Sequence, residues 1–489
     1  WLAAVPSIER VDVVELEPAI LRVAGDCSPV NHDVLGNPRV RIWIGDAREW
    51  LLASRETYDV IFSEPSNPYR AGISSLFTAD FYRAARSRLT PGGIFLQWLQ
   101  AYEVDSGTVR TVYATLGSVF PEVETWHTKQ SDLILAATTE PIIYDGSRLR
   151  ERLRQEPYVS ALRDAWRVSD LEGFLSHFVA RSSLTRTLTS SGHTPLNTDD
   201  ANIVEFAFAR SLGHDTFFDV GEMRQLARSS QEDRPAVSGD VDWAAVNRWR
   251  VAAATSQGRP PAATAGMTME ELRQALAQKS FVEARPEAVL TNWRAQPWEP
   301  RGSIEEIVLA EALAQGGEET AIGFIERIRQ RRSVEADVLL ARLRWRQGRL
   351  EEAAQALERA FQVYREDPWP LAILVRNSFA VVLDIASRDA GLAARLEESL
   401  AQPFALFLLD EERRLIRLEV ASRLDASRYA RAVEDMEPNV PWRRPILERR
   451  AQAYAATGNS LAPLARRELA KFMEREPPPF AAAVAPGKN

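Results

Sequence analysis

The sequence is poor in the residues that bind metals. It has one cysteine, Cys27, among 489 residues, and five histidines that lack the spacing of metal ligands. A single thiol excludes an internal disulfide and any zinc site built from several cysteines. We therefore expect no metal, and the scarcity of cysteine favours a reducing compartment, the cytoplasm.

Long hydrophobic runs are also missing. No stretch of about eighteen apolar residues occurs, and the first residues lack the basic and apolar regions of a signal peptide. We therefore expect no membrane segment in this chain. The formal net charge of −8 argues against nucleic acid as a partner, since non-specific binding to phosphates needs positive charge.

The remaining composition is that of a folded protein with several domains. Hydrophobic residues make up 45% and charged residues 26% of the chain, which is ordinary for globular proteins. Residues 1–140 contain five apolar runs of strand length, separated by amphipathic stretches such as 78–89; the runs are 11–16, 40–44, 58–63, 93–98 and 132–137. This alternation predicts an α/β domain whose parallel sheet is covered on both faces.

The rest of the chain is helical in pattern. We expect a helical extension over 141–230, a linker region rich in Pro, Gly, Ser and Ala over 231–266, and a disordered tail over 477–489. Between them, 267–476 has Leu, Ala and Arg at helical spacing. Gly348 and Ala360 are twelve residues apart, as are Gly458 and Ala470, and this spacing resembles the tetratricopeptide repeat. Degenerate helix-pair repeats would offer a surface to a protein partner, and the oligomeric state stays open, a homo-oligomer included.

Acidic residues follow the first three apolar runs, where an open sheet binds its ligands. Glu15 comes directly after "VDVV" (11–14) in the first run and is suited to accept the two hydroxyl hydrogens of a ribose. Asp46, next to Ala47, follows the second run and is suited to an adenine amino group. Glu64 follows the third run, with Asn67 close behind. The alternative is that these residues only cap helices or shape turns, as single polar residues in loops often do.

These segments also resemble a known family. "VDVVELEP", "VRIWIGDAREWL" and "YDVIFSEPSNPYRAGISSLFTADFYRAARSRLTPGGIFLQW" are similar to successive motifs of the spermidine and spermine synthases, over about the first 140 residues. The resemblance implies the Rossmann-like fold of class I S-adenosylmethionine-dependent methyltransferases. It also implies that Glu15 holds the ribose, and Asp46 with Ala47 the adenine, of decarboxylated S-adenosylmethionine.

The resemblance assigns the acceptor side as well. Glu64 falls where the family has the aspartate that deprotonates the attacking amine, and Asn67 where it has an aspartate facing the diamine. Tyr69 and Gln97 are assigned to the acceptor side with Asn67. Glutamate for aspartate moves the carboxylate by one methylene, and a neutral amide cannot balance a distal ammonium, so the acceptor can differ from putrescine.

A further departure concerns the start of the domain. The family's glycine-rich loop and first strand would lie just before Trp1, so we expect a sheet with two neighbouring exposed edges and a longer polypeptide. "LNTDDANIVEF" (196–206) resembles a stretch of bacterial synthase-like proteins fused to a membrane region, which would then tether the protein from upstream.

The sequence thus favours transfer of an aminopropyl group from decarboxylated S-adenosylmethionine to a small amine. One alternative is a methyltransferase using S-adenosylmethionine itself, because the same fold and acids serve both compounds and "NPY" (67–69) is similar to a motif of amino-methylating enzymes. The other is a non-catalytic scaffold or sensor that binds proteins through its helical repeats.

Overall fold

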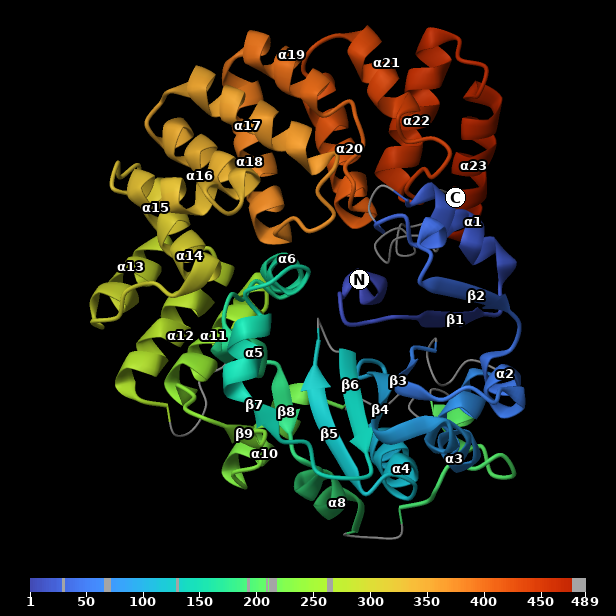
Figure 1. The fold of residues 1–489 in the computed structure, drawn as a ribbon. Helices are drawn as coiled ribbons and strands as arrows, with labels where there is room; N and C mark the ends of the chain where they lie inside the picture. Colours follow the sequence, from blue (N-terminus) through green and yellow to red (C-terminus); the bar gives the residue numbers. More distant parts are fainter. Residues whose placement is uncertain are drawn as a thin grey trace, which may run out of the picture. The chain divides into compact units, whose positions relative to one another are not determined.

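The computed structural model describes residues 1–28, 31–65, 72–128, 132–190, 194–207, 210, 218–261 and 267–476. Within it the chain forms two compact units (Figure 1), Trp1–Lys279 with Gln296–Ile304, and Ser280–Ala295 with Glu305–Asn489. Asn67, Tyr69 and the tail at 477–489 lie outside the described residues. No helix among those described is long and apolar enough to cross a membrane.

The first unit begins with two parallel strands that form a sheet of their own. Strand β1 (Val11–Glu15) pairs with β2 (Val40–Ile44), and the runs predicted at 11–16 and 40–44 are thereby confirmed. The helix after each strand begins at an acidic cap: Glu17 caps α1 (Pro18–Asp26) and Asp46 caps α2 (Ala47–Ala53). These caps satisfy backbone N–H groups that a helix start leaves unpaired.

A second sheet contains five strands in the order β3-β4-β6-β5-β8. Their bounds are β3 Tyr58–Ser63, β4 Leu89–Gln100, β5 Glu122–His127, β6 Asp132–Thr138 and β8 Phe178–Ala180. Only β3 and β4 are parallel; β6 runs antiparallel to β4 and β5, and β8 to β5. The prediction of a parallel sheet was therefore wrong for β5, β6 and β8. The connection from β5 to β6, between residues 127 and 132, is too short for the crossover helix that parallel strands need.

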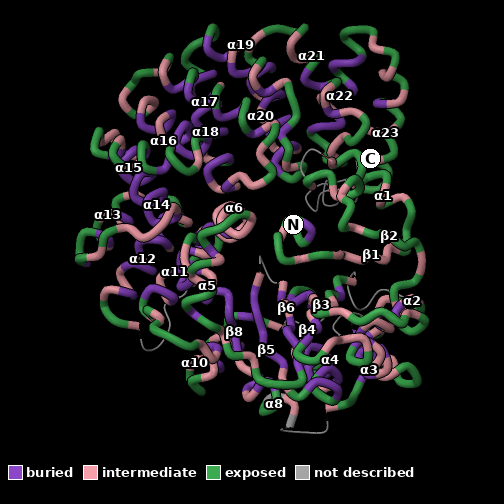
Figure 2. Tube along the Cα trace, in the orientation of Figure 1, coloured by how far each residue is buried: buried purple, intermediate pink, exposed green. Residues whose placement is uncertain are grey.

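The two sheets present neighbouring edges, as the sequence led us to expect. In the described part of the chain β1 pairs only with β2 and β3 only with β4. Val13 is 37% exposed, while Val60 and Phe62 on β3 are 49% and 41% exposed. Figure 2 shows the contrast with β5 and β6, which are largely buried. The N-terminal ends of the two strands are joined by Tyr58, whose hydroxyl donates to Asp12 Oδ2 at 2.8 Å.

An aromatic cluster packs between the five-stranded sheet and the helices α3 (Ala79–Ser87) and α4 (Ser106–Gly117). Phe95 of β4 is fully buried and stacks on Phe120 at 5.6 Å between ring centroids. Thr78 caps α3 by accepting a hydrogen bond from Phe81 N, so the helix start predicted at Thr78 is confirmed. This core fixes the carboxyl ends of β3 and β4.

Shorter elements complete the first unit. They are η1 Leu2–Ala4, η2 Val34–Gly36, η3 Ile73–Phe77, β7 Tyr144–Asp145, α5 Gly146–Arg152, α6 Tyr158–Ala161, η4 Leu162–Trp166, α7 Leu171–Leu175, α8 Ser182–Ser190, η5 Ile203–Phe206, α10 Val220–Ser229, β9 Val237–Ser238 and α11 Trp243–Ser256. The region 231–266, which we expected to be a linker, contains α11 with the buried Trp249, and β9 pairs with β7.

The second unit consists of helices joined by short turns. Helix α12 (Met269–Val282) belongs to the first unit as far as Lys279. The helices that follow it are α13 Pro286–Arg294, α14 Gly302–Gln315, α15 Ala321–Arg329, α16 Ser333–Arg346, α17 Leu350–Tyr364, α18 Ala372–Arg388, α19 Ala390–Ser399, α20 Phe407–Ala421, α21 Ala426–Glu434, α22 Arg444–Thr457 and α23 Ala462–Arg475. Helix α16 packs against α17 and α18, and α18 packs against α19 and α20.

Two glycines allow the tight turns inside these helix pairs. Gly348, between α16 and α17, has a φ of 75°, and Gly458, between α22 and α23, has a φ of 67°. Both values are in the left-handed region that glycine adopts without a steric cost. Of the two alanines at the matching spacing, Ala360 is fully buried and Ala470 is exposed.

Candidate active site

Glu15 lies at the carboxyl end of β1, beside the end of β2. It is opposite Ile44 in the register, and its carbonyl accepts a hydrogen bond from Gly45 N at 3.0 Å. Its side chain is half-buried, and Oε1 accepts from Glu17 N at 2.9 Å. This local bond points the carboxylate along the loop that leaves the strand. The structure therefore places Glu15 and the β2–α2 loop at the same sheet edge, as expected for parallel neighbours.

Asp46 has a structural role that is visible in the fold. Its Oδ1 accepts hydrogen bonds from Arg48 N at 2.7 Å and Glu49 N at 3.1 Å, which makes Asp46 the N-cap of α2. Asp46 therefore caps a helix, which was the alternative interpretation of this residue from the sequence. Asp46 and Ala47 are both exposed. One carboxylate oxygen carries both cap bonds, so capping and contact with a ligand are compatible.

Glu64 follows β3 directly and is exposed to solvent. Partial desolvation raises the pKa of its carboxyl above the ordinary value, and the negative charge of Asp132 raises it further. A carboxylate with a raised pKa holds a proton more readily, which suits a general base that must accept one from an ammonium group. Its sequence neighbours Asn67 and Tyr69 lie outside the described residues.

Gln97 is fully buried on β4. It is opposite Ser63 in the register, and its Nε2 donates to the Trp98 carbonyl at 3.0 Å. Side chains alternate along a strand, so Gln97 shares a face with the core residue Phe95, whereas Trp98 and Gln100 share the other face. The structure does not bring Gln97 together with Asp132, which is paired with Gln100.

Asp132 is a residue of this sheet edge that the sequence reasoning missed. It begins β6, and because β6 is antiparallel to β4, its start lies at the edge where β3 and β4 end. Desolvation raises the pKa of Asp132, although a hydrogen bond with the Trp98 side chain acts in the opposite direction. The signal in the sequence was the Asp that begins the run at 132–137. The assumption of a parallel sheet placed that residue at the opposite edge.

The family model and the curated relatives both match the N-terminal quarter of the chain. The family model described as the spermine/spermidine synthase domain matches residues 2–129. Residues 2–129 form a spermine/spermidine synthase domain. The matched part contains Glu15, Asp46 and Glu64.

Two curated relatives of the synthase domain carry the name polyamine aminopropyltransferase. The protein of Nitrosomonas europaea is 32% identical over 116 residues, covering 24% of this chain and 35% of the relative. That of a Thermoanaerobacter species is 33% identical over 91 residues, covering 19% and 32%. The chain thus spans about a third of the length of these relatives. A probable spermidine synthase structure from Corynebacterium glutamicum matches with a TM-score of 0.27 and 18% identity, over 39% of this chain and 63% of that one.

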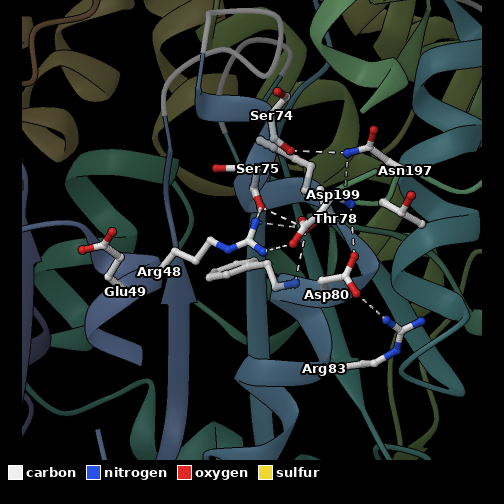
Figure 3. A network of polar contacts seen from close by, with 12 residues as sticks. Arg48, Glu49, Ser74, Ser75, Thr78, Asp80, Arg83, Asn197 and Asp199 are labelled. Atoms are coloured by element: carbon white, nitrogen blue, oxygen red, sulfur yellow. Dashed lines mark hydrogen bonds and ion pairs between the residues drawn. The ribbon is translucent and has the colours of Figure 1, made fainter. Parts of the chain in front are cut away.

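The segment at 196–206 lies beyond the matched residues and packs on the synthase domain. Figure 3 shows Arg48 of α2 paired with Asp199, while its Nη1 donates to the Ser75 carbonyl at 3.0 Å. Asp199 N in turn donates to Asp80 Oδ2 at 3.1 Å. The pairing with Arg48 lowers the pKa of the Asp199 carboxyl. This network ties α2 and α3, which follow β2 and η3, to one loop.

Asn197 is the buried centre of the same loop. Its Nδ2 donates to the carbonyls of Ser74 at 3.3 Å and Phe77 at 3.1 Å, and its Oδ1 accepts from Val204 N at 3.1 Å. Figure 3 shows the Asn197 side chain directed at Ser74. Asn197 is fully buried, so these bonds replace water for three backbone groups. The loop therefore holds η3, which precedes α3 in the synthase domain.

Among the residues that the structure describes, no group of three or more His, Cys, Asp or Glu side chains could hold a metal ion. The described edge of the synthase domain offers carboxylates, an indole and backbone groups. Glu15, Asp46 and Glu64 are its acidic residues at the ends of β1, β2 and β3.

Proposed function

We propose that the synthase domain transfers an aminopropyl group from decarboxylated S-adenosylmethionine to a small amine, with Glu64 as the general base. The observation that carries the proposal is Glu64 itself: an exposed carboxylate with a raised pKa at the carboxyl end of β3, inside a matched synthase domain. The site-residue roles that follow are part of the same proposal.

The nucleoside end of the co-substrate is assigned to the first sheet. Glu15 would accept the hydrogens of both ribose hydroxyls, and Asp46 would accept from the adenine amino group. Asp46 can do so while it caps α2, because the cap bonds use Oδ1. The Ala47 backbone at the first turn of α2 would lie beside the adenine ring. Charge-assisted hydrogen bonds of this kind are stronger than neutral ones.

The reaction requires proton removal and displacement. Glu64 takes a proton from the acceptor ammonium, and the freed nitrogen lone pair forms a bond to the aminopropyl carbon attached to the sulfonium. The carbon–sulfur bond breaks, its electron pair stays on sulfur, and methylthioadenosine leaves as a neutral thioether. The product is a secondary ammonium, and the proton on Glu64 returns to solvent.

The test is a transfer assay with the full chain. Decarboxylated S-adenosylmethionine and a mixture of mono-, di- and triamines are incubated with the protein, and aminopropylated amine and methylthioadenosine are measured by mass spectrometry. We expect both products in equal amounts, and a loss of about 10²-fold or more in Glu64→Gln. Glu49→Gln, an exposed change on α2, should retain activity.

Two other outcomes would replace the proposal. Methylated amine formed from S-adenosylmethionine, with no aminopropyl product, would identify a methyltransferase. Binding of neither compound would leave a scaffold or sensor as the function of the synthase domain.

We further propose that the helices of the second unit are degenerate tetratricopeptide-like repeats that bind a protein partner. The first helices of successive pairs begin at Gly302, Ser333, Ala372, Phe407 and Arg444, which are 31 to 39 residues apart. Regular stacking of such pairs builds an extended binding surface. A crystal structure in which the pairs do not stack with a constant sense of rotation would contradict this assignment.

A cytoplasmic location is proposed on the sequence's single cysteine, Cys27, which is exposed as a free thiol. Fractionation of cells that produce the protein at its natural level checks this. Recovery in the extracellular or periplasmic fraction would contradict it.

A further inference from the structure

Arg48, a residue of α2, links the Asp46 carboxylate to the loop at 196–206. The main-chain N–H of Arg48 donates to Asp46 Oδ1 at 2.7 Å and so helps to fix that carboxylate. The guanidinium of Arg48 is held by other elements: it pairs with Asp199, and its Nη1 donates to the Ser75 carbonyl at 3.0 Å (Figure 3). A shift of the Arg48 guanidinium would therefore be transmitted, through one residue, to a donor of the Asp46 carboxylate.

Asp199 is held in place by bonds that do not involve Arg48. Its N–H donates to Asp80 Oδ2 at 3.1 Å. Two positions earlier, the fully buried Asn197 accepts a hydrogen bond from Ala79 N at 2.9 Å through its carbonyl. The loop thus presents the Asp199 carboxylate from a fixed main chain, and little conformational freedom is lost when that carboxylate pairs with Arg48.

The ion pair between Arg48 and Asp199 is placed to fix a position more than to stabilise the fold. The two side chains are 19% and 42% exposed, and ion pairs that water can reach contribute little to the free energy of unfolding. The other end of α2 is held separately, since Arg88 Nε donates to the Leu51 carbonyl at 3.3 Å. The pair with Asp199 therefore acts mainly on the start of α2, where Asp46 lies.

We propose that Asp199 is a positioning residue of the nucleoside site: through Arg48 it holds the Asp46 carboxylate in the orientation that accepts a hydrogen bond from the adenine amino group. The proposal rests on the nucleoside assignment in the proposed function above. The loop at 196–206 lies outside the residues 2–129 that match the synthase domain. A segment beyond the synthase domain therefore sets how tightly that domain binds its nucleoside.

The test is a calorimetric titration of the full chain with methylthioadenosine and with methylthioinosine, whose base carries an oxygen in place of the amino group. The unaltered protein should bind methylthioadenosine more tightly. Asp199→Asn should weaken this binding about 3- to 10-fold, the cost of ordering one or two side chains, and leave methylthioinosine within about twofold. Asp200→Asn, a change at the exposed neighbouring residue, should alter neither affinity.

A double-mutant cycle tests whether the effect passes through Arg48. Arg48→Gln should weaken methylthioadenosine as Asp199→Asn does. The double variant should bind no more weakly than Arg48→Gln alone, since both changes remove the same interaction. Arg88→Gln, which removes the bond at the other end of α2, is the control for a general loosening of the helix and should leave the preference for methylthioadenosine unchanged.

The outcomes separate this inference from the proposed function. If Asp199→Asn weakens methylthioadenosine as expected but the full chain transfers no aminopropyl group, the proposed function fails and the positioning role stands. If transfer occurs and Asp199→Asn binds methylthioadenosine like the unaltered protein, the positioning role fails and the function stands. Equal losses for both nucleosides, additive losses in the double variant, or no binding of methylthioadenosine by the full chain would also overturn the inference.

Discussion

Tyr58 donates a hydrogen bond of 2.8 Å to Asp12 Oδ2 and so joins the first residues of β3 to β1 across the gap between the two sheets. Arg10 supports the contact, with its guanidinium 3.2 Å from the same Asp12 oxygen and 5.6 Å from the Tyr58 ring centre. The Asp12 side chain is 4% exposed, so the bond forms largely out of water. This bond fixes the sheet of β1 and β2 to the five-stranded sheet.

Removing the Tyr58 hydroxyl should destabilise the first unit. Tyr58→Phe leaves the buried Asp12 carboxylate with fewer donors, and a hydrogen bond to a charged group contributes about 1.5–3 kcal/mol. We expect a loss of this size in the free energy of unfolding, measured by urea denaturation at pH 7. The pKa of Tyr58 is raised to about 12, so the contribution should be complete below about pH 10 and disappear as the pH rises through 12. Equal stability of the two proteins at pH 7 would contradict this account.

Asn197 should be the most sensitive position of the loop at 196–206. Asn197→Ala leaves two buried carbonyls and one buried N–H without their partner, at about 1–3 kcal/mol for each unsatisfied group. We expect a decrease of about 2–5 kcal/mol in the free energy of unfolding. Asn197→Asp keeps the acceptor for Val204 N but loses both donors, and should also be destabilising.

The matched control for this position is Asn202→Ala, which removes one bond of 2.7 Å from Asn202 Nδ2 to the Ser74 hydroxyl. Because the Asn202 side chain is only half-buried, its removal should lower the free energy of unfolding by about 1 kcal/mol. A larger loss for Asn202→Ala than for Asn197→Ala would show that the loop is not held as described.

His177 should make the first unit sensitive to mild acid. It is buried, its Nδ1 bonds to the His127 carbonyl at 2.8 Å, and its ring stacks on Trp166 at 3.8 Å. Burial, together with the positive charges of Arg224 and Arg250, lowers the pKa of His177 to about 3. The unfolded chain binds a proton near pH 6.5 and the folded chain does not, so stability is lost as the pH falls from about 6.5 towards 3.

The expected slope for this histidine is about 1.4 kcal/mol per pH unit between pH 6 and 4. His177→Gln should remove that part of the pH dependence, whatever its effect on stability at pH 7. His32→Gln, a change at an exposed histidine, should leave the slope unchanged. Denaturation curves at several pH values measure it, and identical slopes for all three proteins would refute the assignment.

The pH profile of transfer should report the coupling between Glu64 and Asp132. Glu64 acts as a base only when ionised, and its pKa is raised, so kcat/KM should fall with decreasing pH at a higher pH than an ordinary glutamate gives. Asp132→Asn removes the negative neighbour and should shift this acid limb to lower pH. A limb that stays in place would mean that another group controls it.

Several strands and one helix start of the synthase domain could be predicted from the sequence, because the local residue pattern there agrees with the fold. β-Branched runs flanked by polar residues gave the strands at 11–15, 40–44 and 58–63, and the Thr78 cap gave the start of α3. Strand β5 was missed because its buried positions include Glu124, Thr125 and His127, so no apolar run marks it.

The positions of the candidate site residues could be predicted only where a single strand decides them. Glu15, Asp46 and Glu64 lie at strand ends that the chain itself defines. Asp132 and Gln97 depend on which strands pair and in which direction, and that is decided by the β5–β6 hairpin and by packing of Phe95 against Phe120. Such tertiary information is absent from a local pattern.

The most direct test of the account is a calorimetric titration of the full chain with decarboxylated S-adenosylmethionine and with S-adenosylmethionine. We expect tighter binding of the decarboxylated compound, weakened at least about tenfold by Glu15→Gln through loss of charge-assisted hydrogen bonds and unchanged by Glu9→Gln, an exposed glutamate before β1. Absence of binding, or equal affinity of the Glu15→Gln variant, would contradict the assignment of this sheet edge to an aminopropyl donor.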